Sequence, residues 1–311
     1  MPNHSRRDFL KYSATAGAAA TLGANVPAEA QAAAPAMVIA RWTGAPVPET
    51  EVQAMAVKLT TQAIAELGGM GRFVKKGDTV WVKPNIGWDR KPEFAANTNP
   101  DVVATLVKLC YDAGAKKVKV GDLTCSPAKD TYANSGIAAA ATAAGAEMVF
   151  IDNARFREMA LAGKRLDKWQ VYPDIVESDL VINVPVAKHH TISKVTLCMK
   201  NYMGVVGGRR DAWHQDMPNC LSDITAFMKP KLCVLDAIRI LTANGPTGGN
   251  LADVKRMDTV AAGTDIVALD AFGAELFGHK PADIAFLVEA DKRGLGKMDY
   301  RSLTPKELTI A

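Results

Sequence analysis

The chain has 311 residues, of which 48% are hydrophobic, and a formal net charge of +4. This length is enough for a full hydrophobic core, arranged as one large α/β domain or as two smaller ones. The charge is small for the length and includes Arg6, Arg7 and Lys11 near the N-terminus, so it gives no reason to expect nucleic-acid binding.

The N-terminal segment has the pattern of a twin-arginine export signal. Residues 5–11 read Ser-Arg-Arg-Asp-Phe-Leu-Lys, and the apolar stretch over residues 12–26 is too short and too mild to anchor a protein in a bilayer. We expect a signal peptide over residues 1–30, cleaved near Ala30 or Ala32. The twin-arginine translocase would then carry the folded protein to the periplasm, or otherwise across the cytoplasmic membrane, with no stable membrane anchor.

From residue 37 onward, short β-rich runs alternate with helical patterns. This order favours an α/β fold with a mainly parallel, doubly wound sheet and helices on both faces. Asn99 is the expected cap of a helix that begins at Pro100. The expected elements are a strand at 37–42, a helix at 49–67, a strand at 79–83, a helix at 99–114, a strand at 117–122, a helix-to-strand unit ending at Asp152, strands at 180–184 and 232–235, and helices that start at 264 and 281.

Residues 188–218 contain glycines and charges without a clean hydrophobic period. We therefore expect an inserted loop or small subdomain there, within a single α/β domain over residues 37–300. Loops of this length in compact domains are usually functional.

Five cysteines follow the signal segment, so at least one stays unpaired within the monomer. Cys110 and Cys233 lie in apolar runs and are expected to be buried thiols, whereas Cys125 and Cys198 lie beside polar residues. No pairing among Cys110, Cys125, Cys198, Cys220 and Cys233 follows from the sequence.

Polar residues follow the expected strands at the points where they end. In an open parallel sheet, ligands bind beyond the carboxyl ends of the strands, so we expect these residues to gather in one crevice. Each could instead simply meet solvent. The set comprises Lys83, Asn85, Asp122, Asp152, Lys188, His189, His190 and Asp236.

The segment 188–208 holds the densest cluster of reactive groups. His189 and His190 could bind a transition metal or transfer protons, and Lys194 and Lys200 offer charges to a carboxylate or phosphate. Adjacent residues of a strand point to opposite faces, so we expect one of the two histidines to reach the site. A solvated basic loop is the alternative. Beyond this segment, Arg209, Arg210 and His214 are expected to form a surface patch.

Several motifs of the chain match those of a known family: Lys83-Pro84-Asn85, residues 178–185 followed by Lys188-His189-His190, residues 197–204 around Met199-Lys200-Asn201, Asp236-Ala237-Ile238 leading to Asn244-Gly245-Pro246, and residues 262–265 with 268–270. On these motifs the chain resembles the bacterial and archaeal family known as domain of unknown function 362. The resemblance spans most of the mature chain and carries no assigned reaction. Some members of that family append a ferredoxin-like domain, and this chain lacks its cysteine run, which disfavours such an iron–sulfur cluster.

A more distant similarity is to the N-terminal domain of the nickel-pincer lactate racemase family. It implies, by analogy only, that cationic side chains hold an anionic substrate beside a histidine. The candidate catalytic residues are His189, His190 and Lys194. The candidate ligand-binding residues are Lys83, Asn85, Lys188, Lys200, Asn201 and Asn244, and the candidate ligands of a divalent transition metal are His189, His190, Asp122 and Asp236.

Two interpretations of the function remain open. In the first, the protein is an exported enzyme or metalloprotein of unknown reaction that binds an anionic small molecule at the carboxyl ends of the strands. In the second, it is a non-catalytic ligand carrier of the cell envelope, or an assembly partner of an exported redox enzyme.

Overall fold

The computed structural model describes residues 34–311, which form one compact unit. The expected signal peptide, with its cleavage near Ala30 or Ala32, lies outside the described residues. Within the described residues, no helix is both long and apolar enough to cross a membrane.

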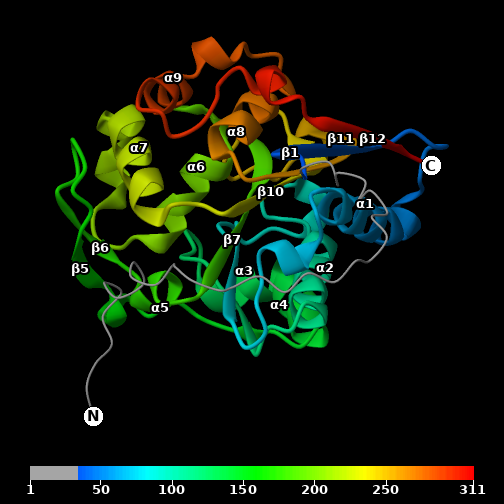
Figure 1. The fold of residues 1–311 in the computed structure, drawn as a ribbon, viewed down its shortest axis with the longest axis horizontal. Coiled ribbons are helices and arrows are strands. Elements are labelled where there is room, and N and C mark those ends of the chain that lie inside the picture. Colours follow the sequence, from blue (N-terminus) through cyan, green and yellow to red (C-terminus); the bar gives the residue numbers. More distant parts are fainter. Residues whose placement is uncertain (1–33) are drawn as a thin grey trace, which may run out of the picture. The chain divides into compact units, whose positions relative to one another are not determined.

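A ten-stranded, mainly parallel sheet runs through the unit (Figure 1). Its strand order is β12-β1-β11-β10-β7-β2-β3-β4, and β8 and β9 attach beside β10. The expected α/β class is confirmed. The strands of this sheet are β1 (Met37–Trp42), β2 (Thr79–Pro84), β3 (Lys117–Val120), β4 (Glu147–Met148), β7 (Leu180–Val184), β8 (Val186–His190), β9 (Lys194–Thr196), β10 (Leu232–Leu241), β11 (Val254–Gly263) and β12 (Lys306–Ile310); β5 (Arg157–Ala160) and β6 (Lys168–Val171) form a separate hairpin.

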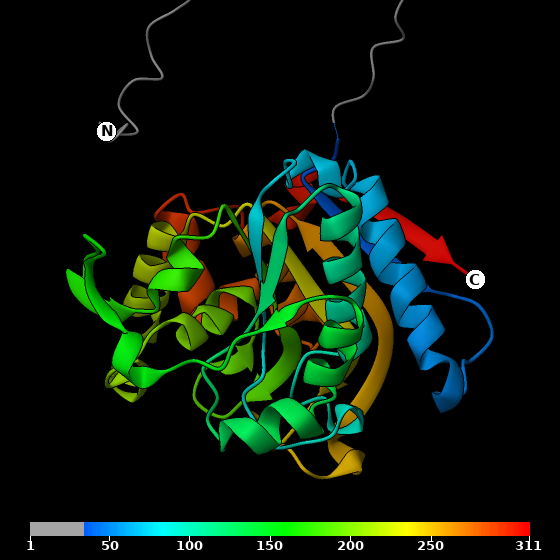
Figure 2. The same ribbon diagram turned by 90° about the horizontal axis from the view of Figure 1, so that it is seen from below.

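Helices cover both faces of the sheet (Figure 2). Alternate residues of β1 show the division, because Ile39 packs into one apolar core and Val38 into the other. The blue α1 and the green α2 and α4 lie on one side, and α6 to α9 lie on the other. The helices are α1 (Val52–Glu66), α2 (Pro100–Asp112), α3 (Ala128–Asn134), α4 (Ile137–Ala143), α5 (Pro173–Val176), α6 (Cys198–Asn201), α7 (Met217–Met228), α8 (Ile266–Glu275) and α9 (Ala285–Lys292).

Local sequence signals place several element ends correctly. The Asn99 side chain accepts hydrogen bonds from the backbone N–H groups of Asp101 and Val102, which makes it the cap of α2. Asp265 caps α8 in the same way, through the N–H of Ala268. The strand expected at 117–122 ends earlier, at Val120, so that Asp122 lies in the loop after it.

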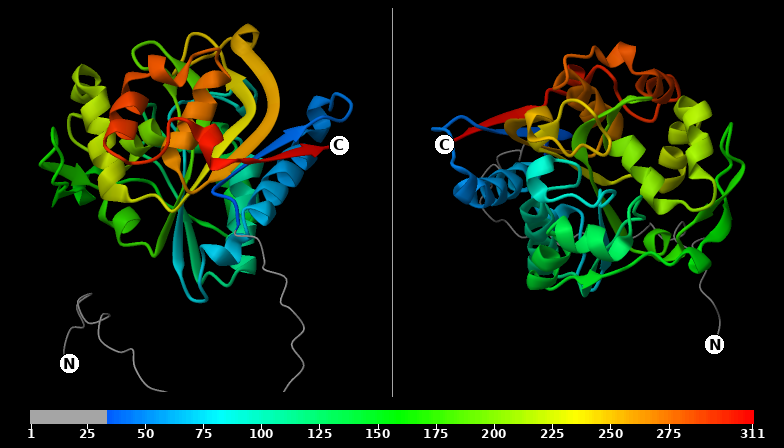
Figure 3. Two further views of the ribbon diagram at one scale, coloured as in Figure 1. Left: turned by 45° about the horizontal axis from the view of Figure 1, so that its top comes forward. Right: turned by 180° about the vertical axis from the view of Figure 1, so that it is seen from behind.

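The strands formed by the C-terminal part of the chain differ from the expectation. β10 runs on to Leu241 and pairs with the antiparallel β11, and the two form a long curved ribbon (Figure 3, yellow and orange). β12 lies parallel to β1 at the edge of the sheet. Neither β11 nor β12 was expected.

Residues 188–218, expected to be an inserted loop or small subdomain, contribute to the main sheet. β8 pairs with β10 in parallel and with β9 in antiparallel fashion. Leu197, Met199 and Tyr202 are fully buried in the core beneath α8. The segment therefore carries its polar side chains on a framework that is packed into the domain.

Candidate functional site

The candidate site lies where the order of the parallel strands reverses. From β2 the chain moves outward to β3 and β4, and it then returns to the other side of β2 through β7 and β10. Ligands of doubly wound sheets bind in the crevice beyond the carboxyl ends of the strands at such a switch point.

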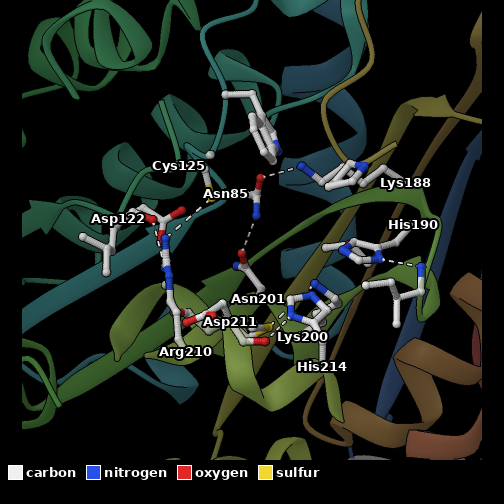
Figure 4. A pocket seen from close by; sticks show the side chains of 18 of the residues that line it. Asn85, Asp122, Cys125, Lys188, His190, Lys200, Asn201, Arg210, Asp211 and His214 are labelled. Carbon is white, nitrogen blue, oxygen red and sulfur yellow. Dashed lines mark hydrogen bonds between the residues drawn. The ribbon is translucent and has the colours of Figure 1, made fainter. Parts of the chain in front are cut away.

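A pocket of about 530 Å³ opens at this point, and we call it the switch-point pocket (Figure 4). Side chains from the loops after β2 and β3, from β8, from α6 and from the following loop meet there. Its lining residues are Asn85, Gly87, Trp88, Asp122, Leu123, Cys125, Lys188, His190, Thr191, Ile192, Thr196, Lys200, Asn201, Met203, Gly204, Arg210, Asp211, His214 and Pro246.

A buried ion pair forms the floor of the site. Lys83 Nζ lies 2.6 Å from Asp122 Oδ1, and both side chains are almost wholly inaccessible. Burial lowers the pKa of Lys83 despite the neighbouring carboxylate. The other Asp122 oxygen accepts the backbone N–H of Ile86, which joins the loops after β2 and β3. A β-carbon at Gly204 would lie 1.8 Å from Asp122 Oδ1, so only glycine fits against the pair.

A chain of amide groups ties this floor to β8. Asn201 Oδ1 accepts from Lys83 Nζ at 3.0 Å and from Asn85 Nδ2 at 3.1 Å. Asn85 Oδ1 in turn accepts from Lys188 Nζ at 2.9 Å, and the Ala96 carbonyl accepts from the same ammonium at 2.6 Å. Lys188 is 1% exposed, and this burial lowers its pKa to about 7.

Of the three cationic side chains that line the pocket, Lys200 makes the fewest hydrogen bonds. Its side chain lies on α6, the residue is only 8% exposed, and its Nζ donates one hydrogen bond, a long one of 3.6 Å to the sulfur of Met203. Burial lowers the pKa of Lys200 to about 8, and the nearby Arg210 guanidinium contributes to the shift. Among the described residues, no carboxylate lies within 4 Å of Lys188, Lys200 or Arg210.

A buried carboxylate holds the helix that carries Lys200. Asp270 on α8 accepts the backbone N–H groups of Cys198 at 2.6 Å and Met199 at 2.9 Å. These donors open the first turn of α6 and would otherwise be buried without partners. Burial raises the pKa of Asp270 to about 7. Asp270 is therefore a positioning residue for Lys200 and Asn201.

The stacked imidazoles of His190 and His214 line the pocket, with ring centroids 5.5 Å apart. His190 Nδ1 accepts the backbone N–H of Ile192 at 3.1 Å, which leaves Nε2 as the protonated nitrogen. His214 Nδ1 lies 2.9 Å from the Asp211 carbonyl, an acceptor only, so its Nε2 is the free acceptor in the neutral ring. Burial and the Lys200 charge lower the pKa of His190 to about 3, so this ring is neutral at pH 7.

Five of the residues expected at the site lie away from the switch-point pocket. Asp152 is exposed, and its side chain accepts the N–H of Ala154. His189 alternates with His190 on β8, and its Nδ1 accepts the N–H of Gly245. Lys194 is exposed at the β8–β9 turn, and Asn244 is exposed and bonded to Asp253. Asp236 is buried and accepts the N–H groups of Asn99 and Ile238.

The four expected metal ligands therefore do not converge. Asp122 is engaged by Lys83, while His189 and Asp236 have backbone partners elsewhere. Within residues 34–311, no group of three histidine, cysteine, aspartate or glutamate side chains is placed to hold a metal ion.

Two residues expected on a surface patch belong to the pocket instead. Arg210 and His214 both line it, so that interpretation was wrong for them, whereas Arg209 is exposed. Arg210 reaches the site because its guanidinium donates to the carbonyls of Leu123, Thr124 and Met203. Leu123 and Thr124 lie 87 and 86 residues before Arg210 in the sequence, so no local sequence pattern predicts these contacts. Cys125 lies beside Thr124 in the loop after β3, and it also lines the pocket.

The fold and the pocket define a doubly wound α/β protein with a cationic crevice at its switch point. The chain belongs to the family described as domain of unknown function DUF362, whose profile matches residues 80–275. The matched region includes the ion pair, the amide chain, α6, Arg210 and Asp270.

One protein is similar to this chain in sequence, and another is similar in structure. A thylakoid-associated protein of Synechocystis sp. is 28% identical over 256 residues, which cover 78% of each chain. The lactate racemase apoprotein of Thermoanaerobacterium thermosaccharolyticum aligns in structure with a TM-score of 0.44 and 10% identity. That alignment covers 77% of this chain, which spans about 56% of the racemase chain.

The N-terminus matches a twin-arginine translocation signal over residues 3–23. The protein is therefore exported across the cytoplasmic membrane in folded form by the twin-arginine translocase.

Proposed function

We propose that this exported protein binds a small anionic molecule in the switch-point pocket. The observation that carries the proposal is the state of Lys200, whose ammonium is buried against a sulfur atom with no carboxylate beside it. A buried charge is costly unless it is paired. A carboxylate, phosphate or sulfate in the pocket would supply the missing partner.

The rest of the lining supports the same ligand class. Arg210 and Lys188 are further cations whose partners are uncharged oxygen atoms or the Cys125 sulfur. Thr196 Oγ1 is buried in the lining and has no hydrogen-bond partner among the described residues. The volume of about 530 Å³ lies within the usual range for small-molecule sites.

Thermal unfolding in the presence of candidate ligands tests the proposal. Small monocarboxylates, dicarboxylates, phosphate and sulfate should raise the unfolding temperature, and the neutral amides of the same acids should not. A ligand at 100 times its Kd stabilises by about 2.7 kcal/mol. Lys200→Met should abolish the shift, and Lys108→Met, at an exposed position of α2, should retain it. Equal shifts in both variants would contradict the proposal.

Proton transfer on the bound anion is a second candidate function. It is favoured by the His190–His214 stack, which presents one protonated and one free Nε2 in the neutral state. Such a pair can give and accept protons. Exchange of ligand C–H protons in deuterated water, followed by NMR, distinguishes an enzyme from a carrier. Binding without exchange would support the non-catalytic carrier.

A further inference from the structure

Cys125 is the accessible thiol of this chain. It follows β3, is exposed, and lines the switch-point pocket. The other four cysteines, Cys110, Cys198, Cys220 and Cys233, are buried, and all five are free thiols. A reagent that enters the pocket therefore meets a single thiol among its lining residues.

A fixed arginine side chain lies beside the Cys125 sulfur. Arg210 Nη2 donates toward Cys125 Sγ at 3.6 Å, and its three carbonyl partners fix the guanidinium in place. The thiolate is the nucleophile in thiol chemistry, and a guanidinium N–H can donate to it. The Lys200 ammonium, whose hydrogen bond goes to the Met203 sulfur, lines the same pocket and can hold a negative group on the incoming molecule.

The export route moves the Cys125 thiol from a reducing to an oxidising compartment. The protein folds in the cytoplasm, where thiols are kept reduced, and then enters an oxidising compartment in which disulfides form. Within residues 34–311, Cys125 is the one exposed cysteine, so in that compartment it has no second exposed thiol there with which to close an internal disulfide.

We infer that Cys125 captures small anionic disulfides by thiol–disulfide exchange, with Lys200 and Arg210 recognising their negative charge. In this step the Cys125 thiol loses its proton to solvent and its thiolate attacks one sulfur of the disulfide. The S–S bond of the reagent breaks, a new S–S bond forms to Cys125, and the other half leaves as a thiolate. The protein sulfur is oxidised, and the departing half is reduced. The inference rests on the proposed anion site.

The test compares two aromatic disulfides that release a coloured product. Dithiobis(nitrobenzoate) carries two carboxylates, and dithiodipyridine is neutral. Cys125→Ser should abolish the fast reaction with both reagents. Lys200→Met should slow the anionic reagent about tenfold relative to the neutral one, and Lys108→Met should leave the ratio of rates unchanged. Intact-protein mass after exposure to glutathione disulfide should show one adduct, absent in Cys125→Ser.

Salt provides a second readout that needs no variant at Lys200. Added sodium chloride should slow the anionic reagent with the wild-type protein and leave the neutral reagent unaffected. Fast labelling that persists in Cys125→Ser, or a ratio of rates that neither salt nor Lys200→Met changes, would overturn the inference. If anions still stabilise the wild-type protein in that case, only the role of Cys125 fails. If they do not, the proposed anion site fails as well.

Discussion

Lys83 Nζ and Asp122 Oδ1 form a 2.6 Å ion pair beneath the pocket, with almost no access to solvent. Lys83 lies near the end of β2 and Asp122 lies in the loop after β3, and these two strands pair in parallel. The pair therefore links the strand ends that build the site, and its integrity should govern both stability and ligand binding.

Breaking this pair on one side should be more harmful than removing both charges. Lys83→Met leaves the Asp122 carboxylate buried without its cation, and the expected loss of unfolding free energy is about 3–5 kcal/mol. The double variant Lys83→Met/Asp122→Asn should recover part of that loss. Chemical denaturation of the three proteins measures the effect. A double variant less stable than Lys83→Met would show that the charges do not act as a pair.

Gly204→Ala should destabilise the protein through the same pair. The added β-carbon would lie 1.8 Å from Asp122 Oδ1 and 2.7 Å from Lys83 Nζ, so the site must shift. The expected cost is about 1–3 kcal/mol. Gly71→Ala is the matched control, because nothing lies within 4 Å of its added carbon and its backbone is not left-handed. Similar melting temperatures for the two variants would contradict the close packing described at Gly204.

Asp270→Ala should weaken anion binding although the residue does not line the pocket. The change leaves the N–H groups of Cys198 and Met199 buried without an acceptor, at a cost of about 1–3 kcal/mol, and releases the first turn of α6. Asp130→Ala, at an exposed position of α3, serves as the control. Anion affinity and thermal stability should both fall in the first variant only. Unchanged affinity in a destabilised Asp270→Ala protein would limit the role of Asp270 to stability.

Anion affinity should decrease between pH 6 and pH 9. The pKa values of Lys188 and Lys200 are lowered to about 7 and about 8, so each loses its positive charge as pH rises through that value. Sulfate stays fully ionised over this range, so only the protein titrates. Where binding requires a lysine to be protonated, the affinity should fall by up to about tenfold per pH unit above the pKa of that lysine. Lys200→Arg keeps its charge throughout and should flatten the profile.

A pH-independent affinity in the wild-type protein would contradict this assignment. It would mean that neither buried lysine contributes its charge to the bound anion.

The central part of the fold could be predicted because its signals are local. The hydrophobic run of β2, the Asn99 cap of α2 and the strand at 180–184 are each visible in a few residues. Once the sheet is taken as parallel, its topology brings the loops after β2 and β3 together. This is why Lys83, Asn85 and Asp122 could be assigned to one crevice from the sequence.

The remaining parts depend on partners far away in sequence. β12 is mostly exposed, and it becomes a strand because β1 pairs with it across more than 260 residues. Arg210 lies in an exposed, charged stretch, and only its carbonyl partners in the loop after β3 bring it into the pocket. Asp236 ends up away from the site because β10 continues past it to Leu241.

The most direct test of anion binding is calorimetric titration of sulfate, and of small dicarboxylates, into the exported protein at pH 6.5 and low ionic strength. Our proposal predicts saturable binding at one site, lost in Lys200→Met and retained in Lys108→Met. Absence of saturable binding by any anion, or equal affinity in the wild-type and Lys200→Met proteins, would contradict it.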